Sequence, residues 1–373
     1  MEPFLYASAH GNSAEKLLES CLNGLGEIPE SANLGFLYAT DALAGDLQHL
    51  LVRLKTHVPQ IDWVGSLGVG LCSTAKEFYD EPALVLMVGS FPDDSYRLIP
   101  DFHNELAELD PTLLDWWQSQ AACFALLHAD PTNPQVTDLL SQLAEQAYTT
   151  FLNGGLTSSQ SENYQLVNRV VSGGVSGVLF NERVEVLTDH TQGCSPIGPV
   201  HRLTDAHRNV AFRIDNRPAL EVLKEDVGEV LSRDLSQSAG YIFTALPIPG
   251  SDTGDYLVRN LIGIDEENGL IAVGDYLEGQ SQLMFCRRDG NTAREDMLRM
   301  LQRLKSRLAG RQIRGGIYVS CLGRGRYQFG PDSEELKLIE SELGSFPLVG
   351  FFANGEIYNG RLYGYTGVLT LFV

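Results

Sequence analysis

Two short stretches near the C-terminus hold residue types that suit a small zwitterion. In the first, Ser320–Arg326, an arginine stands between two glycines, and the second is the turn Asn354–Glu356. Glycine lets backbone amides approach an anion, and the planar guanidinium of Arg324 can bind a carboxylate through two hydrogen bonds. Glu356 supplies the opposite charge, for an ammonium group. The two stretches therefore predict an amino-acid pocket, with a plain ion pair between Arg324 and Glu356 as the alternative.

Three further loops are rich in glycine or small polar residues: Gly65–Cys72, Gly154–Ser159 and Thr191–Pro199. In any one loop, tight turns and close packing explain the glycines as well as a ligand does, so both explanations stay open. Taken from these loops and the two stretches above, the residues expected to bind a ligand are Gly155, Thr157, Cys194, Cys321, Gly323, Arg324, Gly325, Asn354, Gly355 and Glu356.

The sequence lacks the usual signatures of catalysis and metal binding. It contains no GxxxxGK[ST], HExxH or GxSxG pattern, and its Gly-Arg-Gly at 323–325 is not completed to a dinucleotide fingerprint. Its eight histidines and six cysteines do not fall at metal-ligand spacing. We expect no catalytic residue, no metal and no cofactor. A nucleophilic Cys321 or Cys194 is the alternative, although free cysteine is more often a small buried hydrophobic residue.

The elements that must position these loops follow one plan three times. Each stretch has a strand, an amphipathic helix, a glycine and a closing strand, and the spacing from first strand to glycine is similar (34 to 65, 122 to 154, 316 to 350). A true repeat and ordinary alternation both fit this pattern. The expected strand, helix and closing strand are 34–40, 46–57 and 83–88; then 121–128, 136–148 and 175–180; then 316–321, 334–343 and 368–373.

This plan predicts an α/β fold with mixed sheets. A crossover helix joins parallel strands and a short return gives antiparallel pairing, so each sheet should contain both. We expect mixed sheets built from repeated strand–helix–strand–strand units, packed together and covered by helices. The apolar C-terminal run 368–373 should be a paired, buried strand.

The remaining segments are less regular. We expect strands at 184–188 and 210–214, a helix from 217 to 231, and a helix from Thr292 to Leu308 opened by a Thr292–Glu295 capping box. Residues 92–120 form a lid or a linker. We place the domain boundary where the helix after residue 215 begins, which gives an N-terminal half 1–215 and a C-terminal half 216–373 with a large shared interface.

Charge and composition exclude several functions. The 373 residues include 27 Lys and Arg against 48 Asp and Glu, a net charge of −21, which repels nucleic acid and anionic lipid. The apolar runs are of strand length, too short to span a bilayer, and no secretion signal opens the chain. The sparse cysteines do not make a disulfide scaffold. We therefore expect a soluble protein of the reducing cytoplasm, without nucleic-acid binding or membrane insertion.

Four segments together resemble one known family. Thr191–Pro199 (TQGCSPIGP), Asn209–Leu223, Ser320–Gly325 (SCLGRG) and Pro347–Ile357 (PLVGFFANGEI) are similar to the FIST sensory module, whose name abbreviates F-box and intracellular signal transduction. The resemblance runs from about Leu34 to the C-terminus and includes an N-terminal and a C-terminal FIST half. It implies a cytoplasmic sensory domain that binds a small ligand, with amino acids or their derivatives as proposed ligands, and a separate signalling protein as output partner.

Two hypotheses of different classes follow. In the first, the protein is a small-molecule sensor in signal transduction without catalysis of its own. In the second, it is a hydrolase or transferase that acts on an amino-acid derivative through Cys321 or Cys194. A pure interaction scaffold is a weaker third. Saturable thermal stabilisation by amino acids would favour the sensor, and product formation would favour the enzyme.

Overall fold

The computed structural model describes residues 2–119, 122–146, 150–228, 240–248 and 256–373. The chain divides into two compact units, residues 1–192 with 294–373 and residues 193–293. The second unit is thus an insertion in the sequence of the first. The predicted boundary after residue 215 lies within the second unit.

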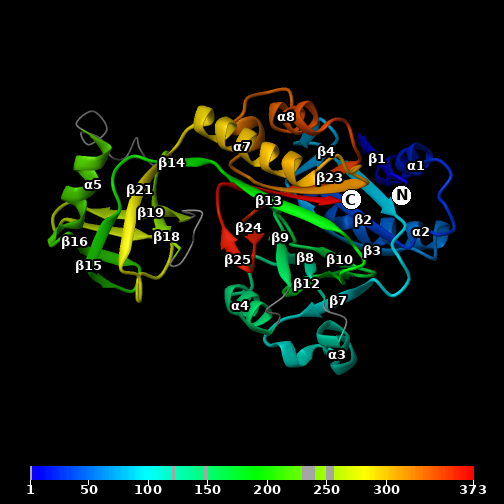
Figure 1. Ribbon diagram of the computed structural model, residues 1–373, viewed down its shortest axis with the longest axis horizontal. Helices are drawn as coiled ribbons and strands as arrows, with labels where there is room; N and C mark the ends of the chain where they lie inside the picture. The colour runs from blue at the N-terminus through cyan, green and yellow to red at the C-terminus, as the bar shows by residue number, and fades with distance from the viewer. Residues whose placement is uncertain (1, 120–121, 147–149, 229–239, 249–255) are drawn as a thin grey trace. The chain divides into compact units, whose positions relative to one another are not determined.

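The first unit is built from three copies of one motif (Figure 1). In each copy two strands joined by a helix are parallel, and a later strand pairs antiparallel with the first of them. The copies are β2 (Leu34–Thr40), α2 (Leu47–His57), β3 (Asp62–Gly68) and β6 (Ala83–Gly89); β8 (Phe124–Ala129), α4 (Val136–Gln146), β9 (Phe151–Leu156) and β12 (Val175–Phe180); and β22 (Gly315–Cys321), α8 (Glu334–Leu343), β23 (Leu348–Ala353) and β26 (Thr366–Phe372). The mixed α/β fold and the repeat are confirmed.

The glycine of each copy occupies the same place in its sheet. Gly65, Gly154 and Gly350 stand opposite the middle of the neighbouring parallel strand, at Leu37, Leu127 and Tyr318. A Cβ atom on any of the three would lie 1.7–1.8 Å from the carbonyl oxygen of that neighbour. Close backbone approach therefore requires glycine here, which explains the regular spacing seen in the sequence.

The three copies exchange strands in a cycle. After β3 the chain enters β4 (Gly70–Ser73), which pairs with β23 of the third copy. After β23 it enters β24 (Glu356–Tyr358), which pairs with β9 of the second. After β9 it reaches β10 (Gln165–Val167), which pairs with β3 of the first. Each sheet is thus completed by a strand from another copy.

Further strands bring each of these sheets to six in the described residues. They are β1 (Leu5–His10), β5 (Lys76–Tyr79), β7 (Tyr96–Phe102), β11 (Val170–Val171), β13 (Val186–Gln192) and β25 (Arg361–Tyr363). One buried core joins residues of all three sheets, among them Phe36, Phe124 and Phe351. Separate clusters lie under α1 (Ala14–Leu25) and α2, and under α3 (Pro111–Ser119) and α4.

Residues 92–119 belong to the body of the first unit. Within them, β7 pairs with β12 at the edge of the second sheet, and α3 buries Trp116 and Trp117 in the core beneath it. Residue 120 lies outside the described residues. The described part of this segment is therefore neither a linker nor a lid.

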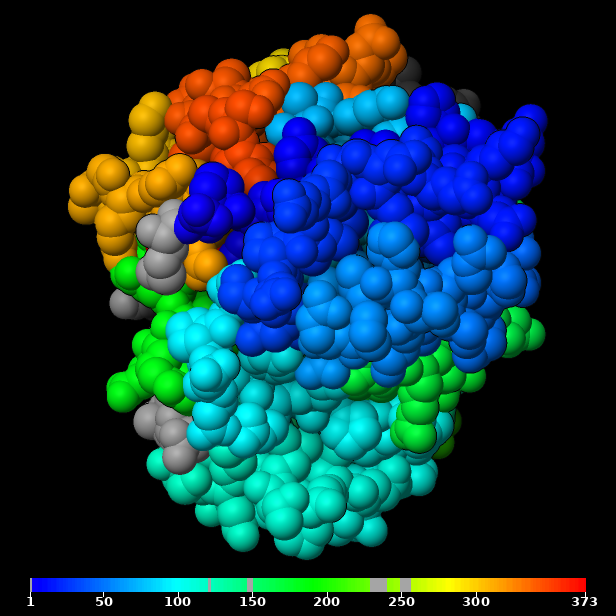
Figure 2. Space-filling view, turned by 90° about the vertical axis from the view of Figure 1, so that its right-hand side faces the viewer, coloured from blue at the N-terminus to red at the C-terminus, as the bar shows by residue number. Residues whose placement is uncertain are grey.

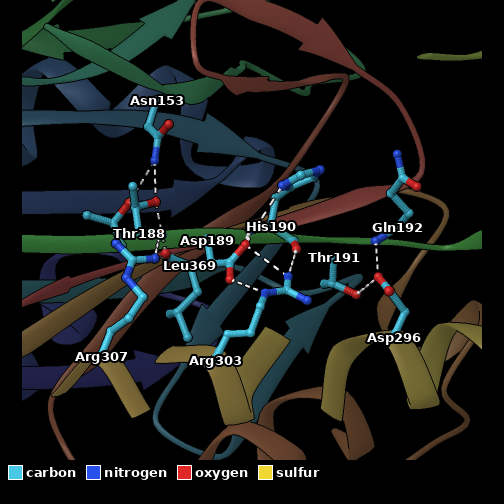
Figure 3. A network of polar contacts seen from close by, with 11 residues as sticks. Asn153, Thr188, Asp189, His190, Thr191, Gln192, Asp296, Arg303, Arg307 and Leu369 are labelled. Atoms are coloured by element: carbon cyan, nitrogen blue, oxygen red, sulfur yellow. Dashed lines mark hydrogen bonds and ion pairs between the residues drawn. The ribbon is translucent and has the colours of Figure 1, made fainter. Parts of the chain in front are cut away.

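Helix α7 (Gly290–Leu308) is tied to strand β13 by charged side chains (Figure 3). Arg303 donates two hydrogen bonds to the carboxylate of Asp189, at 2.8 and 3.0 Å. Asp296 accepts from the backbone N–H of Gln192 at 2.6 Å and from the hydroxyl of Thr191 at 2.9 Å. Geometry of this kind, with both oxygens of a buried carboxylate engaged, fixes a helix against a strand more firmly than an exposed pair would.

The start of α7 differs from the expectation. The helix begins at Gly290, two residues before Thr292. The side chain of Asp289 accepts the backbone N–H of Thr292 at 2.9 Å, so Asp289 is the N-cap. The predicted capping box is wrong because an aspartate three residues earlier offers a stronger acceptor for the same amide.

The second unit is a closed antiparallel barrel. Around it run β21 (Gln282–Arg288), β15 (His201–His207), β16 (Val210–Ile214), β20 (Leu270–Val273), β19 (Tyr256–Asp265) and β18 (Ile242–Pro247), which pairs again with β21. Short β14 (Cys194–Pro196) adds to β21, and β17 (Arg217–Pro218) precedes α5 (Ala219–Val227), whose apolar face packs into the barrel core. The predicted helix reaches Val227, and 229–231 lie outside the described residues. Closure of a barrel was not predicted.

The C-terminal strand is paired and buried, as expected. Strand β26 lies between β13 and β22, and Val373 donates its N–H to the carbonyl of Glu185 at 3.1 Å. No helix in the described part of the chain is long and apolar enough to cross a membrane.

Candidate ligand-binding site

A cavity of about 690 Å³ opens where the three copies of the first unit meet. It lies at the carboxyl ends of the parallel strands, where open α/β sheets usually bind ligands. Residues from four of the glycine-rich loops and turns line it together: Val69, Ser158 and Ser159, Leu322 and Arg326, and Asn354. The remaining lining residues are Thr40, Asp41, Ala42, Tyr79, Asp80, Glu81, Gln160, Ser161 and Tyr327.

Strand exchange explains why these loops converge. Val69 lies between β3 and β4, Ser158–Ser161 between β9 and β10, and Asn354 between β23 and β24. Each is therefore the point at which the chain leaves its own sheet for another. The loops are joined by Ser158, whose hydroxyl accepts the N–H of Val69 at 3.0 Å and donates to the carbonyl of Phe352.

One side of the cavity carries an arginine between two aromatic rings. The guanidinium of Arg326 lies 4.3 Å from the ring centre of Tyr79 and 4.9 Å from that of Tyr327. It pairs with Asp80 at 2.7 Å, and its side chain remains 34% exposed. A partly exposed guanidinium held by ring faces keeps donors available for an incoming carboxylate. Hydrogen bonding to Tyr327, the largest cause, raises the pKa of Arg326 further, so it stays charged.

Carboxylates give the same cavity its negative charge. Asp41 follows β2 and accepts the backbone N–H of Gln160 at 2.9 Å. Glu81 pairs with His10 at 2.8 Å, and Asp80 holds Arg326. The hydroxyl of Thr40, the residue before Asp41, accepts a hydrogen bond from the N–H of Ala83 at 2.8 Å. The cavity thus offers one arginine and several acidic groups fixed by strand ends.

Arg324, the predicted anion contact, does not line this cavity. It is 0% exposed, and its Nε donates to Glu335 of α8 at 2.8 Å. Glu335 also accepts from Tyr318 and from the backbone N–H of Gly325, both at 2.7 Å. The alternative explanation, an ion pair between Arg324 and Glu356, is therefore wrong, since the partner of Arg324 is Glu335. This buried pair positions the loop that carries Arg326, while Nη1 of Arg324 is left without a hydrogen-bond partner among the described residues.

Glu356 is also fully buried. Its Oε2 accepts the N–H and the hydroxyl of Thr366, at 3.1 and 2.7 Å. Burial, the largest cause, raises the pKa of Glu356 to about 8, against the lowering effect of Thr366 and Arg324. Cys321 lies beside it, and burial together with the Glu356 charge raises the pKa of the Cys321 thiol well above its ordinary value.

The other predicted residues lie in or near the cavity wall. Asn354 is exposed and lines the cavity, and Gly355 accepts the N–H of Leu156 at 2.8 Å. Gly155 of β9 stands opposite Glu356 of β24 in the antiparallel pairing of these strands. A Cβ atom on Gly155 would lie 2.6 Å from the side chain of Val319. The hydroxyl of Thr157 bonds that of Ser66 at 2.8 Å. Gly323 and Gly325 flank the buried Arg324. A ligand contact by these residues stays a prediction.

Cys194 belongs to the second unit. It is buried in β14, where its carbonyl accepts the hydroxyl of Tyr256 at 2.6 Å. Its thiol contacts that of Cys286, and this contact is the largest cause of the raised pKa of Cys286. Its surroundings are those of a small hydrophobic residue.

Sequence reasoning missed Asp41, Tyr79 and Arg326. The sequence does contain a pattern that indicates Asp41. It directly follows the strand 34–40, and ligands of α/β proteins usually bind at the carboxyl ends of parallel strands. Arg326 stood in the predicted stretch beside Arg324, and the pattern did not say which arginine faces inward. Tyr79 carries no such signal, because β5 reaches the cavity only through exchange of strands between copies.

Comparison with known proteins gives one consistent result. The family model described as the FIST N domain matches residues 33–217, and that described as the FIST C domain matches residues 219–359. A protein of Mycobacterium tuberculosis strain H37Rv, described as uncharacterized, is 30% identical over 344 residues, which are 87% of each chain. An uncharacterized protein of Mycobacterium bovis is 35% identical over 194 residues, 49% of each chain.

Proposed function

Because this chain belongs to the FIST family, whose domains are associated with sensing in signal transduction, we propose that it is a sensor that binds an amino acid or amino-acid derivative and performs no chemistry itself. The cavity described above is the proposed site. Its combination of one arginine with several carboxylates carries the proposal. At about 690 Å³ it has room for a derivative larger than a free amino acid.

The two ends of such a ligand have partners of opposite charge. Its carboxylate would bind Arg326, whose present partner Asp80 has a 74% exposed side chain. An exposed pair of this kind is worth only about 0–1 kcal/mol, so a ligand can share or replace it. The ammonium group would bind the side that carries Asp41. The rings of Tyr79 and Tyr327 would then cover the ligand's side chain.

A thermal-shift screen of amino acids and their amides and esters tests this proposal. A true ligand at about 100 times its Kd stabilises the native state by about 2.7 kcal/mol. Arg326→Gln should weaken its binding by about tenfold or more, because a charge-assisted contact is lost. Arg53→Gln is the matched control, since Arg53 is an exposed arginine of α2 paired with Glu15. Equal binding by both variants would contradict the assignment of this cavity.

The enzyme alternative makes a different prediction. Catalysis by Cys321 requires a thiolate, and the raised pKa of this thiol keeps it protonated at neutral pH. This supports binding without catalysis. Product formation from an amino-acid ester or amide that disappears in Cys321→Ser or Cys194→Ser would favour the enzyme instead. Location in the cytoplasm and signalling through a separate protein belong to the same proposal.

A further inference from the structure

A second cavity, of about 510 Å³, lies beside the first sheet, at the end of its strands opposite to the cavity described above. It is lined by residues near the start of β1, the start of β2 and the end of β6, and by Arg314 directly before β22. Strands β2 and β22 begin at this cavity, whereas the first cavity lies where the parallel strands end, so the two cavities are separate. Figure 2 shows this face of the unit, with the dark blue N-terminal residues beside orange residues from later in the chain.

Arg314 is held firmly in the wall of this cavity. Arg314 is 7% exposed. Its backbone carbonyl accepts the N–H of Phe4 at 2.7 Å, and its backbone N–H donates to the carbonyl of Phe372 at 2.8 Å. Its Nη2 donates to the carbonyl of Ser90 at 2.7 Å and its Nε to that of Glu2 at 3.3 Å. The guanidinium lies 4.7 Å from the ring centre of Phe4.

The guanidinium of Arg314 is not paired with a carboxylate in the described part of the chain. There, no carboxylate oxygen lies within 4.0 Å of the guanidinium. Burial alone accounts for the lowered pKa of Arg314. Among the described residues its Nη1 donates no hydrogen bond, and it is not one of the buried unpaired atoms, so it keeps access to solvent. A guanidinium fixed in a cavity wall, with a solvent-accessible donor and no paired carboxylate, is suited to bind an anion.

The remaining walls define the rest of the ligand. Most are apolar: Phe4, Pro29, Val88, Phe91 and Pro92. The hydroxyls of Ser31 and Ser90 also line the cavity and hydrogen-bond each other at 2.9 Å. The exposed acidic residues Glu2 and Asp93 also line the cavity and oppose an anion of high charge. A single negative charge on an apolar body meets all of these conditions.

We propose that this cavity is a second ligand site, which binds a monocarboxylate with an aromatic or aliphatic tail. The carboxylate accepts a hydrogen bond from Nη1 of Arg314, and the tail lies against the apolar wall to which Phe4, Pro29 and Val88 contribute. The site is independent of the amino-acid pocket and requires no free ammonium group.

Calorimetric titration of the full chain with benzoate tests the proposal. Benzoate should bind saturably below about 10 mM, while its neutral isostere benzamide and inorganic phosphate should bind at least about tenfold more weakly. Failure of benzoate to saturate would overturn the proposal. Equal binding of benzamide would overturn the role of Arg314, and tighter binding of phosphate would overturn the choice of a monocarboxylate.

Two kinds of variant place the binding at this cavity. Arg314→Gln should weaken benzoate by more than about tenfold, but it also removes two contacts of a buried residue. Ser31→Glu avoids this problem because Ser31 is exposed. It places a negative charge at the mouth and should weaken benzoate about tenfold, whereas the neutral Ser31→Gln of similar size should not. Equal affinities for Ser31→Glu and Ser31→Gln would overturn the proposal.

The same variants keep this site distinct from the proposed function. Ser31→Glu should leave the binding of an amino-acid ligand at the first cavity unchanged, because Ser31 lies outside that cavity. A loss of both kinds of binding would place benzoate in the amino-acid pocket and would overturn the second site.

Discussion

Two arginines separated by one residue have opposite surroundings in this protein. Arg324 is completely buried against Glu335, whereas the side chain of Arg326 is 34% exposed in the cavity. Gly325 between them has a positive φ of 51°, and a Cβ there would lie 2.0 Å from the hydroxyl of Tyr79. Glycine is therefore needed at the turn that directs the guanidinium of Arg324 into the core and that of Arg326 to the cavity.

The buried carboxyl of Glu356 predicts how stability depends on pH. Its pKa is raised from 4.5 to about 8 in the folded protein, so the folded state holds a proton that the unfolded state releases. The neutral Glu356 carboxyl therefore contributes to the stability of the folded state. This contribution is fully present below pH 4.5 and is lost as the pH rises through about 8. Between these values each pH unit should cost up to about 1.4 kcal/mol.

Urea denaturation at several pH values between 5 and 9 measures this slope. Glu356→Gln removes the titrating group but keeps the shape, so its unfolding free energy should fall less steeply with pH. Glu77, whose pKa is also raised to about 8, chiefly by burial, will keep part of the slope. An unchanged slope in Glu356→Gln would mean that Glu356 is ionised in the folded protein.

At the scale of elements, local patterns predicted much of the first unit. Strand 34–40 and helix 334–343 have the expected bounds, because a fully apolar run and a helical stripe are each set by local sequence. The glycine spacing predicted a repeat because each glycine answers the same local requirement for close backbone approach.

What the sequence could not predict depends on contacts between distant elements. Glu335 is one of several glutamates on α8, and only packing selects it as the partner of Arg324. Strands β4, β10 and β24 pair with sheets of other copies, but this exchange does not alter the hydrophobic pattern of each strand. The local sequence therefore does not predict which sheet each strand joins. Closure of the barrel depends on the pairing of β18 with β21, which lie far apart in sequence.

The start of α7 shows how an element boundary depends on one side chain. Asp289→Ala should cost about 1 kcal/mol of unfolding free energy, because it removes the acceptor for the N–H of Thr292. Thr292→Ala is the matched comparison and should cost less, since Thr292 lies inside the helix. Guanidinium denaturation of both variants measures the difference. A larger loss in Thr292→Ala would restore the capping box predicted from sequence.

At the scale of the first unit, strand exchange joins site and stability. No sheet is complete without a strand from another copy, and the cavity is lined by the loops where those strands cross over. A ligand bound at the proposed site would touch all three copies at once. Its binding energy would therefore stabilise the whole first unit, and in the proposed sensor this would couple occupancy of the cavity to the stability of the fold.

Gly350→Ala tests whether the three copies unfold together. The new Cβ would lie 1.8 Å from the carbonyl oxygen of Tyr318 and would force β22 and β23 apart, at a cost of about 3 kcal/mol or more. All three tryptophans lie elsewhere, Trp63 in β3 and Trp116 and Trp117 in α3, so their fluorescence reports the first two copies. If strand exchange makes the unit cooperative, the tryptophan melting transition should fall together with that of circular dichroism. Gly45→Ala, where a Cβ meets nothing within 4 Å, should leave both unchanged. An unshifted tryptophan transition in Gly350→Ala would show that the third copy unfolds alone.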